Sequence, residues 1–186
     1  SALVGADADA VLGALLLDEG ASYAEIHPLM VGTLCELVAR RLALDADARA
    51  SLLAAVFSCN LGLLPAQAAL AQPGPLAPPL EAIVREHPAR SHTLLRAHGV
   101  SDSLWLTIVL QHHERPDGQG YPGQLRGAAI EPLARLVSLA DIYSAMVLPR
   151  EYRTGIRAQQ AVRQIFLARG QHVDAGRRPP RRGPEK

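Results

Sequence analysis

Apolar residues recur along this chain at three- and four-residue intervals, a spacing that places them on one face of a helix. No segment of useful length alternates between apolar and polar positions as a half-buried strand does. We therefore predict an all-α fold, a single-domain bundle of about six to seven helices. They are expected over residues 11–17, 27–42, 46–57, 80–96, 103–113, 132–146 and 155–170.

The same spacing predicts the buried faces. In the second, third and sixth helices these are Met30, Leu34, Leu37 and Val38, then Leu52, Leu53, Val56 and Phe57, then Leu133, Leu136, Val137 and Ala140. Polar N-caps are expected before three helices, at Asp45, Asp102 and Thr154. Pro88 within the fourth helix predicts a kink or a break near His87.

The start of the second helix allows two interpretations. Ser22 and Glu25 have the spacing of a capping box, which would begin the helix directly after Ser22. That start would place Pro28 inside the helix, where proline removes a backbone hydrogen bond. Because proline is tolerated in the first turn, we predict that the helix begins near His27.

Composition narrows the class of protein. The 186 residues fit one domain, and a net charge of +1 gives no reason to expect a DNA or RNA partner or a membrane surface. Cys35 and Cys59 are too few for a disulfide framework and are expected to be reduced. The apolar run at 104–110 is too short to cross a membrane, and residues 11–17 lack the basic leader of a signal peptide. We expect a cytoplasmic protein.

The residues that can carry chemistry gather in one stretch, residues 112–125, which reads HHERPDGQGYPGQL. Two imidazoles at the end of a buried helix, followed by a loop of glycine and proline, can place nitrogen ligands at the floor of a cleft. His112 and His113 lie about 100° apart around a helix, so both face one cleft most easily at its end. The stretch indicates a transition-metal site.

This stretch resembles the HD-GYP family, named for a His-Asp pair and a Gly-Tyr-Pro loop. The motif HHExxDGxGYP is followed by IEPLAR at 130–135 and DIYSAM at 141–146, and the resemblance covers about residues 22–168. It implies a bacterial phosphodiesterase that opens cyclic di-GMP at two or three Fe, Mn or Zn ions. We accordingly expect a helical lead-in at 1–20, an HD-GYP-like domain at 21–170 and a flexible Arg/Pro-rich tail at 171–186.

Carried over residue by residue, the resemblance implies five metal ligands: His27, His87, His112, His113 and Asp141. The chain departs from the family at the His-Asp pair. Where the family has HDxGK this sequence reads CNLGL, so Cys59, Asn60 and Leu63 replace histidine, aspartate and lysine. Asparagine is neutral and cannot bridge two cations as a carboxylate does, and cysteine would select a softer metal. We therefore predict that hydrolysis is lost or badly impaired.

The resemblance also implies groups that contact nucleotide and partner. Arg150 and Arg153 match basic positions that contact phosphate, although a solvated surface pair is the alternative, and Tyr121 could stack on a base. The expected docking loop for a GGDEF-type cyclase or another signalling protein comprises Asp117, Gly118, Gly120, Tyr121 and Pro122.

Three functions are consistent with these features. The first is a degenerate HD-GYP domain that binds cyclic di-GMP or partner proteins, with little or no phosphodiesterase activity. The second is an active phosphodiesterase with an altered or mononuclear metal site. The third is a structural module that forms a homodimer within a larger regulator and binds neither metal nor nucleotide.

Overall fold

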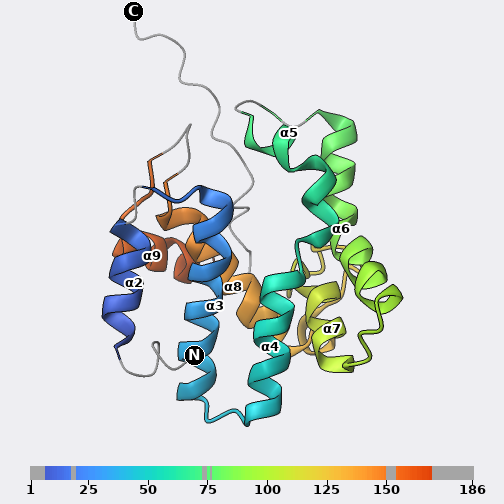
Figure 1. Cartoon of the computed structure of the whole chain (residues 1–186), viewed down its shortest axis with the longest axis horizontal. Helices are drawn as coiled ribbons and strands as arrows, with labels where there is room; N and C mark the ends of the chain where they lie inside the picture. The colour runs from blue at the N-terminus through green and yellow to red at the C-terminus, as the bar shows by residue number, and fades with distance from the viewer. Residues whose placement is uncertain (1–6, 18–19, 73–74, 76, 150–153, 169–186) are drawn as a thin grey trace, which may run out of the picture.

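The computed structural model describes residues 7–17, 20–72, 75, 77–149 and 154–168 (Figure 1). Its α-helices are α2 (Ala8–Leu17), α3 (Tyr23–Arg41), α4 (Ala46–Ser58), α5 (Gln67–Ala71), α6 (Pro78–Ala97), α7 (Ser103–Gln111), α8 (Pro132–Val147) and α9 (Ala158–Leu167). Two 3-10 helices are η1 (Leu61–Ala66) and η2 (Gly127–Ala129). The described part contains no strand, only an isolated bridge between Asp117 and Arg126. The all-α prediction is confirmed.

Helices α3, α4, α7 and α8 form the centre of the bundle. α3 packs against α4 and α8, α7 packs against α4 and α8, and α6 covers α7 and η1 (Figure 1). Their shared core includes Cys35, Leu52, Ile108, Val109 and Ala134, none of which is exposed. Removal of these apolar side chains from water stabilises the bundle. A smaller cluster lies where α2 packs on α3 and α9 on α8.

The second predicted helix starts one turn earlier than expected. α3 begins at Tyr23 with Ser22 as its N-cap, and the backbone N–H of Ser22 donates to the Glu25 carboxylate at 2.8 Å. The predicted start near His27 is therefore wrong. Pro28 lies inside the helix, where it removes only one hydrogen bond. The capping contacts and the burial of the inner face outweigh that loss.

The predicted inner face of α3 is partly wrong. Met30 is buried, but Leu34 and Leu37 are half-buried and Val38 is 38% exposed. Both α4 and α8 contact α3, and the buried face of α3 contains Val31, Cys35 and Ala39 instead of Leu34 and Val38. The face predicted for α8 is confirmed, since three of its four members are buried and the fourth is half-buried.

One predicted core residue of α4 lies at the surface. Leu52 and Val56 are buried and Leu53 is half-buried, but Phe57 is 54% exposed. Its ring lies over Gly32 of α3, where a Cβ atom would stand 2.9 Å from the ring. The glycine therefore lets the aromatic ring cover α3 from outside instead of entering the core.

Most predicted helix boundaries agree with the structure. Asp45 and Asp102 are the N-caps of α4 and α7. Helix α6 continues through Pro88, so the chain has no break near His87. Besides the start of α3, Thr154 is an exception, because it does not cap the last helix. Residues 154–157 are not helical, the Ile156 N–H donates to the Met146 carbonyl at the end of α8, and α9 starts only at residue 158 with Arg157 as its N-cap. The expected tail at 171–186 lies outside the described residues.

One helical stretch, Ala46–Leu70, is long and apolar enough by composition to cross a membrane. It changes helix type at η1, which contains Pro65. Leu52, Ala55 and Val56 within it are at most 3% exposed and belong to the core that α4 shares with α7. Burial inside the bundle therefore accounts for the apolar character of these three residues.

A buried glutamate links α3 to α4. Glu36 is 2% exposed, and its carboxylate accepts hydrogen bonds from Arg40 of α3 and Arg49 of α4. Burial alone would raise the pKa of Glu36, but the hydrogen bonds and charges of both arginines lower it below its usual value. The carboxylate is therefore ionised at neutral pH and paired with two cations.

We predict that Glu36→Gln lowers the free energy of unfolding by about 2 kcal/mol at pH 7, because it removes charge-assisted hydrogen bonds from a buried group. The folded pKa lies below the unfolded value of about 4.3, so this contribution is complete above that value and is lost as pH falls through the folded pKa. Urea titrations between pH 7 and pH 2 will measure both effects. Glu86→Gln breaks an exposed pair with Arg90 and should cost less than about 0.5 kcal/mol. An equal cost for both variants would contradict the prediction.

Candidate metal centre

Three histidines, from α6 and from the turn that follows α7, lie close together. His87 lies on α6, and His112 and His113 follow the end of α7. One ring nitrogen of each lies within 4.8 Å of the others, and the Nε2 atoms of His87 and His112 are 3.1 Å apart. We call these three residues the histidine trio. The expectation that the two adjacent histidines share one cleft at the end of their helix agrees with this geometry.

Backbone carbonyls fix the tautomers of two of these rings. Nδ1 of His87 lies 2.6 Å from the Val84 oxygen, and Nδ1 of His112 lies 2.7 Å from the Val109 oxygen. A carbonyl only accepts hydrogen bonds, so in the neutral rings Nδ1 carries the hydrogen and Nε2 presents a lone pair. Two lone pairs that face each other at 3.1 Å are best satisfied by a shared cation. The arrangement fits a divalent metal ion, with two imidazole ligands already oriented.

Burial keeps these two rings uncharged. His87 and His112 are each 1% exposed. Burial, together with the repulsion that a protonated His112 would exert, lowers the pKa of His87 to about 3, and burial also lowers the pKa of His112. Both rings are therefore neutral at neutral pH and need not lose a proton to bind a metal ion.

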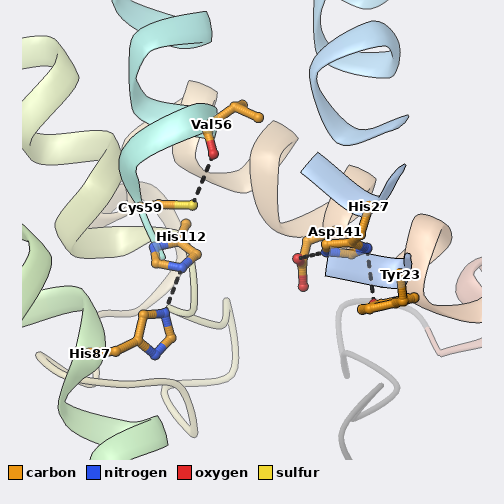
Figure 2. Close-up of polar contacts among 7 residues, drawn as sticks. All are labelled: Tyr23, His27, Val56, Cys59, His87, His112 and Asp141. Atoms are coloured by element: carbon orange, nitrogen blue, oxygen red, sulfur yellow. Dashed lines mark hydrogen bonds and ion pairs between the residues drawn. The ribbon is translucent and has the colours of Figure 1, made fainter. Parts of the chain in front are cut away.

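The other two predicted ligands form a pair of their own. His27 on α3 and Asp141 on α8 face each other, with Nε2 of His27 2.9 Å from Oδ1 of Asp141 (Figure 2). Burial alone would raise the pKa of Asp141, but the hydrogen bond and charge of His27 hold it below its usual range. The charge of Asp141 also acts on His87 and His112, so the pair and the trio share one region of the molecule.

The residues at the His-Asp positions supply no anion to the trio. Cys59 is buried, and its thiol donates to the Val56 carbonyl at 3.4 Å (Figure 2). Burial and the charge of Asp141 raise the pKa of this thiol, so it is protonated at neutral pH. Asn60 is exposed at the start of η1, and Leu63 within η1 is half-buried.

A buried carboxylate anchors the loop that follows the trio. Glu114 is 1% exposed, and its carboxylate accepts hydrogen bonds from the backbone N–H groups of Gly123 and Leu125. Sequence reasoning gave this residue no role of its own. Glu114 directly follows the paired histidines and precedes the glycines of the motif, and this position could have indicated its role. A buried carboxylate needs hydrogen-bond donors, and the backbone of a glycine-rich loop supplies them.

The Gly-Tyr-Pro loop packs directly against the trio. The Tyr121 ring is stacked on the ring of His113, with centroids 4.9 Å apart and an interplanar angle of 28°. The Arg85 guanidinium carbon lies 5.2 Å from the centroid of the same tyrosine. The predicted substrate contact of Tyr121 is thus placed beside the histidines, and its role stays a prediction.

The other members of the expected docking loop also shape the loop itself. Asp117 pairs with Arg115 at 2.6 Å and accepts a hydrogen bond from the backbone of Gln119 at 2.9 Å. Gly118 has a φ of +76°, a conformation that glycine adopts without strain. Gly120 is buried and Pro122 is exposed. Docking by this loop stays a prediction.

Arg150 and Arg153, the predicted phosphate contacts, lie outside the described residues. Of the five predicted ligands, the structure places three in the trio and two in the His27–Asp141 pair. No other cluster of three metal-ligating side chains as close as the trio occurs in the described part of the chain.

Comparison with known proteins agrees with this picture. The sequence profile of the HD domain family matches residues 14–176. A cyclic di-GMP phosphodiesterase of Pseudomonas aeruginosa is 32% identical over 167 residues, which are 89% of this chain and 40% of that protein. A 3′3′-cGAMP-specific phosphodiesterase of Vibrio cholerae is 31% identical over 146 residues, which are 77% of this chain and 33% of that protein.

The fold has a solved counterpart. An HDG"Y"P protein of Bdellovibrio bacteriovorus superposes with a TM-score of 0.73 at 22% identity, over 96% of this chain and 56% of that one. The chain spans less than half the length of the curated relatives that it matches. The profile, which covers most of the chain, shows that this chain belongs to the HD domain family.

Proposed function

We propose that this chain is a degenerate HD-GYP domain of bacterial cyclic di-GMP signalling, which binds nucleotide or partner proteins and has little or no phosphodiesterase activity. The observation that carries the proposal is the distribution of charge at the metal centre. The trio consists of imidazole rings, the carboxylate of Asp141 is hydrogen-bonded to His27, and asparagine occupies the family's aspartate position at residue 60.

A second metal ion is disfavoured by this distribution of charge. Two divalent ions a few ångströms apart repel each other strongly, and a bridging carboxylate neutralises part of that repulsion. The Asn60 amide is neutral, and burial keeps the Cys59 thiol protonated. A site with one ion lacks the two-metal clamp on the attacking and leaving oxygens of a phosphodiester. Leu63 in turn supplies no cation to a substrate phosphate.

The relatives support the class of ligand. They are named as phosphodiesterases for cyclic di-GMP and for 3′3′-cGAMP, two cyclic dinucleotides. Arg85 offers a guanidinium next to the trio, which suits a phosphate, and it lies over the ring of Tyr121. We propose that the intact Gly-Tyr-Pro loop retains the docking of a GGDEF-type cyclase or another signalling protein.

The convergent Nε2 atoms of the trio favour a second candidate, a phosphodiesterase with one metal ion. A bound divalent ion would act as a Lewis acid and lower the pKa of bound water. His87 and His112 would hold it with their fixed lone pairs, and Asp141 would supply charge nearby. This candidate predicts turnover that depends on the trio.

The two candidates are separated by cyclic di-GMP and 3′3′-cGAMP turnover in protein loaded with Fe(II), Mn(II) or Zn(II). The matched control is the double variant His112→Ala/His113→Ala. We expect the wild-type protein to bind a cyclic dinucleotide in calorimetry while its turnover does not exceed that of the variant. Steady turnover that vanishes in the variant would overturn the leading proposal in favour of the one-metal enzyme. Absence of both binding and turnover would contradict the one-metal enzyme and the nucleotide-binding form of the leading proposal, and would leave binding of partner proteins or the structural module.

A further inference from the structure

The side chain of Arg85 on α6 lies against the Gly-Tyr-Pro loop. Its guanidinium carbon is 5.2 Å from the centroid of the Tyr121 ring, which is stacked on His113 and lies 6.4 Å from the centroid of His87. Arg85 and His87 are two residues apart, and residues at that spacing on a helix do not face the same way. The contact with Tyr121 is therefore what brings the guanidinium beside the trio.

Arg85 differs from two neighbouring arginines in having no carboxylate partner. Arg90, five residues later on α6, pairs with Glu86 at 2.8 Å, and Arg115 of the loop pairs with Asp117 at 2.6 Å. In the part of the chain that the structure describes, Arg85 is exposed and its side chain forms no ion pair and no hydrogen bond. Its charge and its five N–H donors are therefore available to a ligand.

The Tyr121 ring restricts a side chain that would otherwise move freely. A guanidinium over an aromatic ring is attracted by the ring electrons and keeps its N–H groups for hydrogen bonds to other groups. An arginine that is already held in this way loses less conformational entropy when a ligand binds. The Tyr121 ring itself is occupied, since both His113 and Arg85 lie against it. Tyr121 is therefore better placed to orient Arg85 than to stack on a base.

We propose that Arg85 contacts a phosphodiester group of the bound cyclic dinucleotide, and that Tyr121 is a positioning residue that holds the Arg85 guanidinium beside the trio. The fork of N–H donors on a guanidinium matches two oxygens of one phosphate group. Because Tyr121 contacts both Arg85 and the trio, a phosphate held by Arg85 lies close to the histidines. This inference rests on the nucleotide binding of the proposed function and adds the residue that recognises the phosphate.

Calorimetry with cyclic di-GMP compares Arg85→Ala with Arg90→Ala. Both variants remove one positive charge from an exposed position of α6, but only Arg90 is paired with a carboxylate. We expect Arg85→Ala to bind cyclic di-GMP about tenfold or more weakly, the usual loss for a charge-assisted hydrogen bond, and Arg90→Ala to bind within about twofold of wild type.

A second ligand separates phosphate contact from base contact. 3′3′-cGAMP has the same phosphodiester ring as cyclic di-GMP, with one guanine replaced by adenine. If Arg85 contacts the phosphate, Arg85→Ala should lose the same factor in affinity for both ligands. A loss confined to cyclic di-GMP would mean that Arg85 contacts a guanine base, and it would overturn the phosphate contact.

Two variants of Tyr121 test its positioning role. Tyr121→Phe keeps the aromatic face and should bind cyclic di-GMP within about twofold of wild type, whereas Tyr121→Leu should bind about threefold or more weakly. In the Arg85→Ala background, Tyr121→Leu should cause no further loss, because no guanidinium is left to hold. An equal loss from Tyr121→Leu in both backgrounds would overturn the positioning role.

The wild-type protein separates the failure of this inference from that of the proposed function. If the wild type binds cyclic di-GMP and Arg85→Ala binds it equally well, the role of Arg85 is wrong and the nucleotide binding stands. If the wild type binds neither dinucleotide, the nucleotide binding of the proposed function is wrong, and the role of Arg85 is wrong with it.

Discussion

Replacement of Gly120 by alanine is expected to lower the free energy of unfolding by about 3 kcal/mol and to detach the Gly-Tyr-Pro loop from the trio. A Cβ atom at this position would stand 2.4 Å from the backbone nitrogen of Arg115 and 2.6 Å from both Glu114 Cα and the His113 carbonyl oxygen. All three neighbours are backbone atoms, so no side-chain rotation relieves the overlap. The loop must move, and the stack of Tyr121 on His113 must open.

Urea titration and zinc binding measure the two effects of Gly120→Ala. The matched control is Gly13→Ala in α2, where no atom lies within 4 Å of the added methyl group and the stability should rise by up to about 1 kcal/mol. Zinc affinity should fall in Gly120→Ala and stay unchanged in the control. If Gly120→Ala unfolds within about 0.5 kcal/mol of wild type and binds zinc normally, the close crossing of the loop over residues 113–115 is not required.

Local chemistry predicted the helices well and their environment less well. The caps Asp45 and Asp102 act on the first turn of their own helices, so the sequence alone identifies them. Val38 and Phe57 were misplaced because their burial depends on which neighbours contact α3 and α4, and a single helix pattern does not contain that information. The start of α3 was mispredicted because Pro28 removes one backbone hydrogen bond, and this local cost is offset by the burial of the helix in the folded protein.

The sequence predicted which residues form the candidate site but not the hydrogen bonds and contacts between them. The motif indicated His112 and His113, but the partner of His27 lies 114 positions away on α8, and only the fold brings it close. Tyr23 contacts His27 because the Ser22 capping box starts α3 at Tyr23. The sequence contains this capping box, but Pro28 favoured a later start of the helix. Glu114 belongs to the sequence motif, but its hydrogen bonds to the backbone of Gly123 and Leu125 can be identified only from the folded loop.

The triple change Cys59→His, Asn60→Asp and Leu63→Lys is expected to raise cyclic di-GMP turnover roughly a hundredfold or more above wild type, since a single electrostatic stabiliser of a transition state is often worth that much. The aspartate would supply the bridging anion, the histidine a nitrogen ligand in place of the protonated thiol, and the lysine a cation for the substrate phosphate. Hydrolysis and metal content per chain should rise together.

The larger histidine at position 59 must be accommodated in a buried site, at a cost of about 1–3 kcal/mol. Stability of the triple variant must therefore be measured alongside its activity. The matched control replaces Leu63→Lys by Leu64→Lys, which adds the same charge to η1 at a side chain that is 59% exposed. Turnover in the triple variant and little in the control would assign the loss of activity to the three replaced residues. A folded triple variant that holds two metal ions and still fails to hydrolyse would show that the CNLGL substitutions are not the cause, because charge and ligands would then be restored without restoring the reaction.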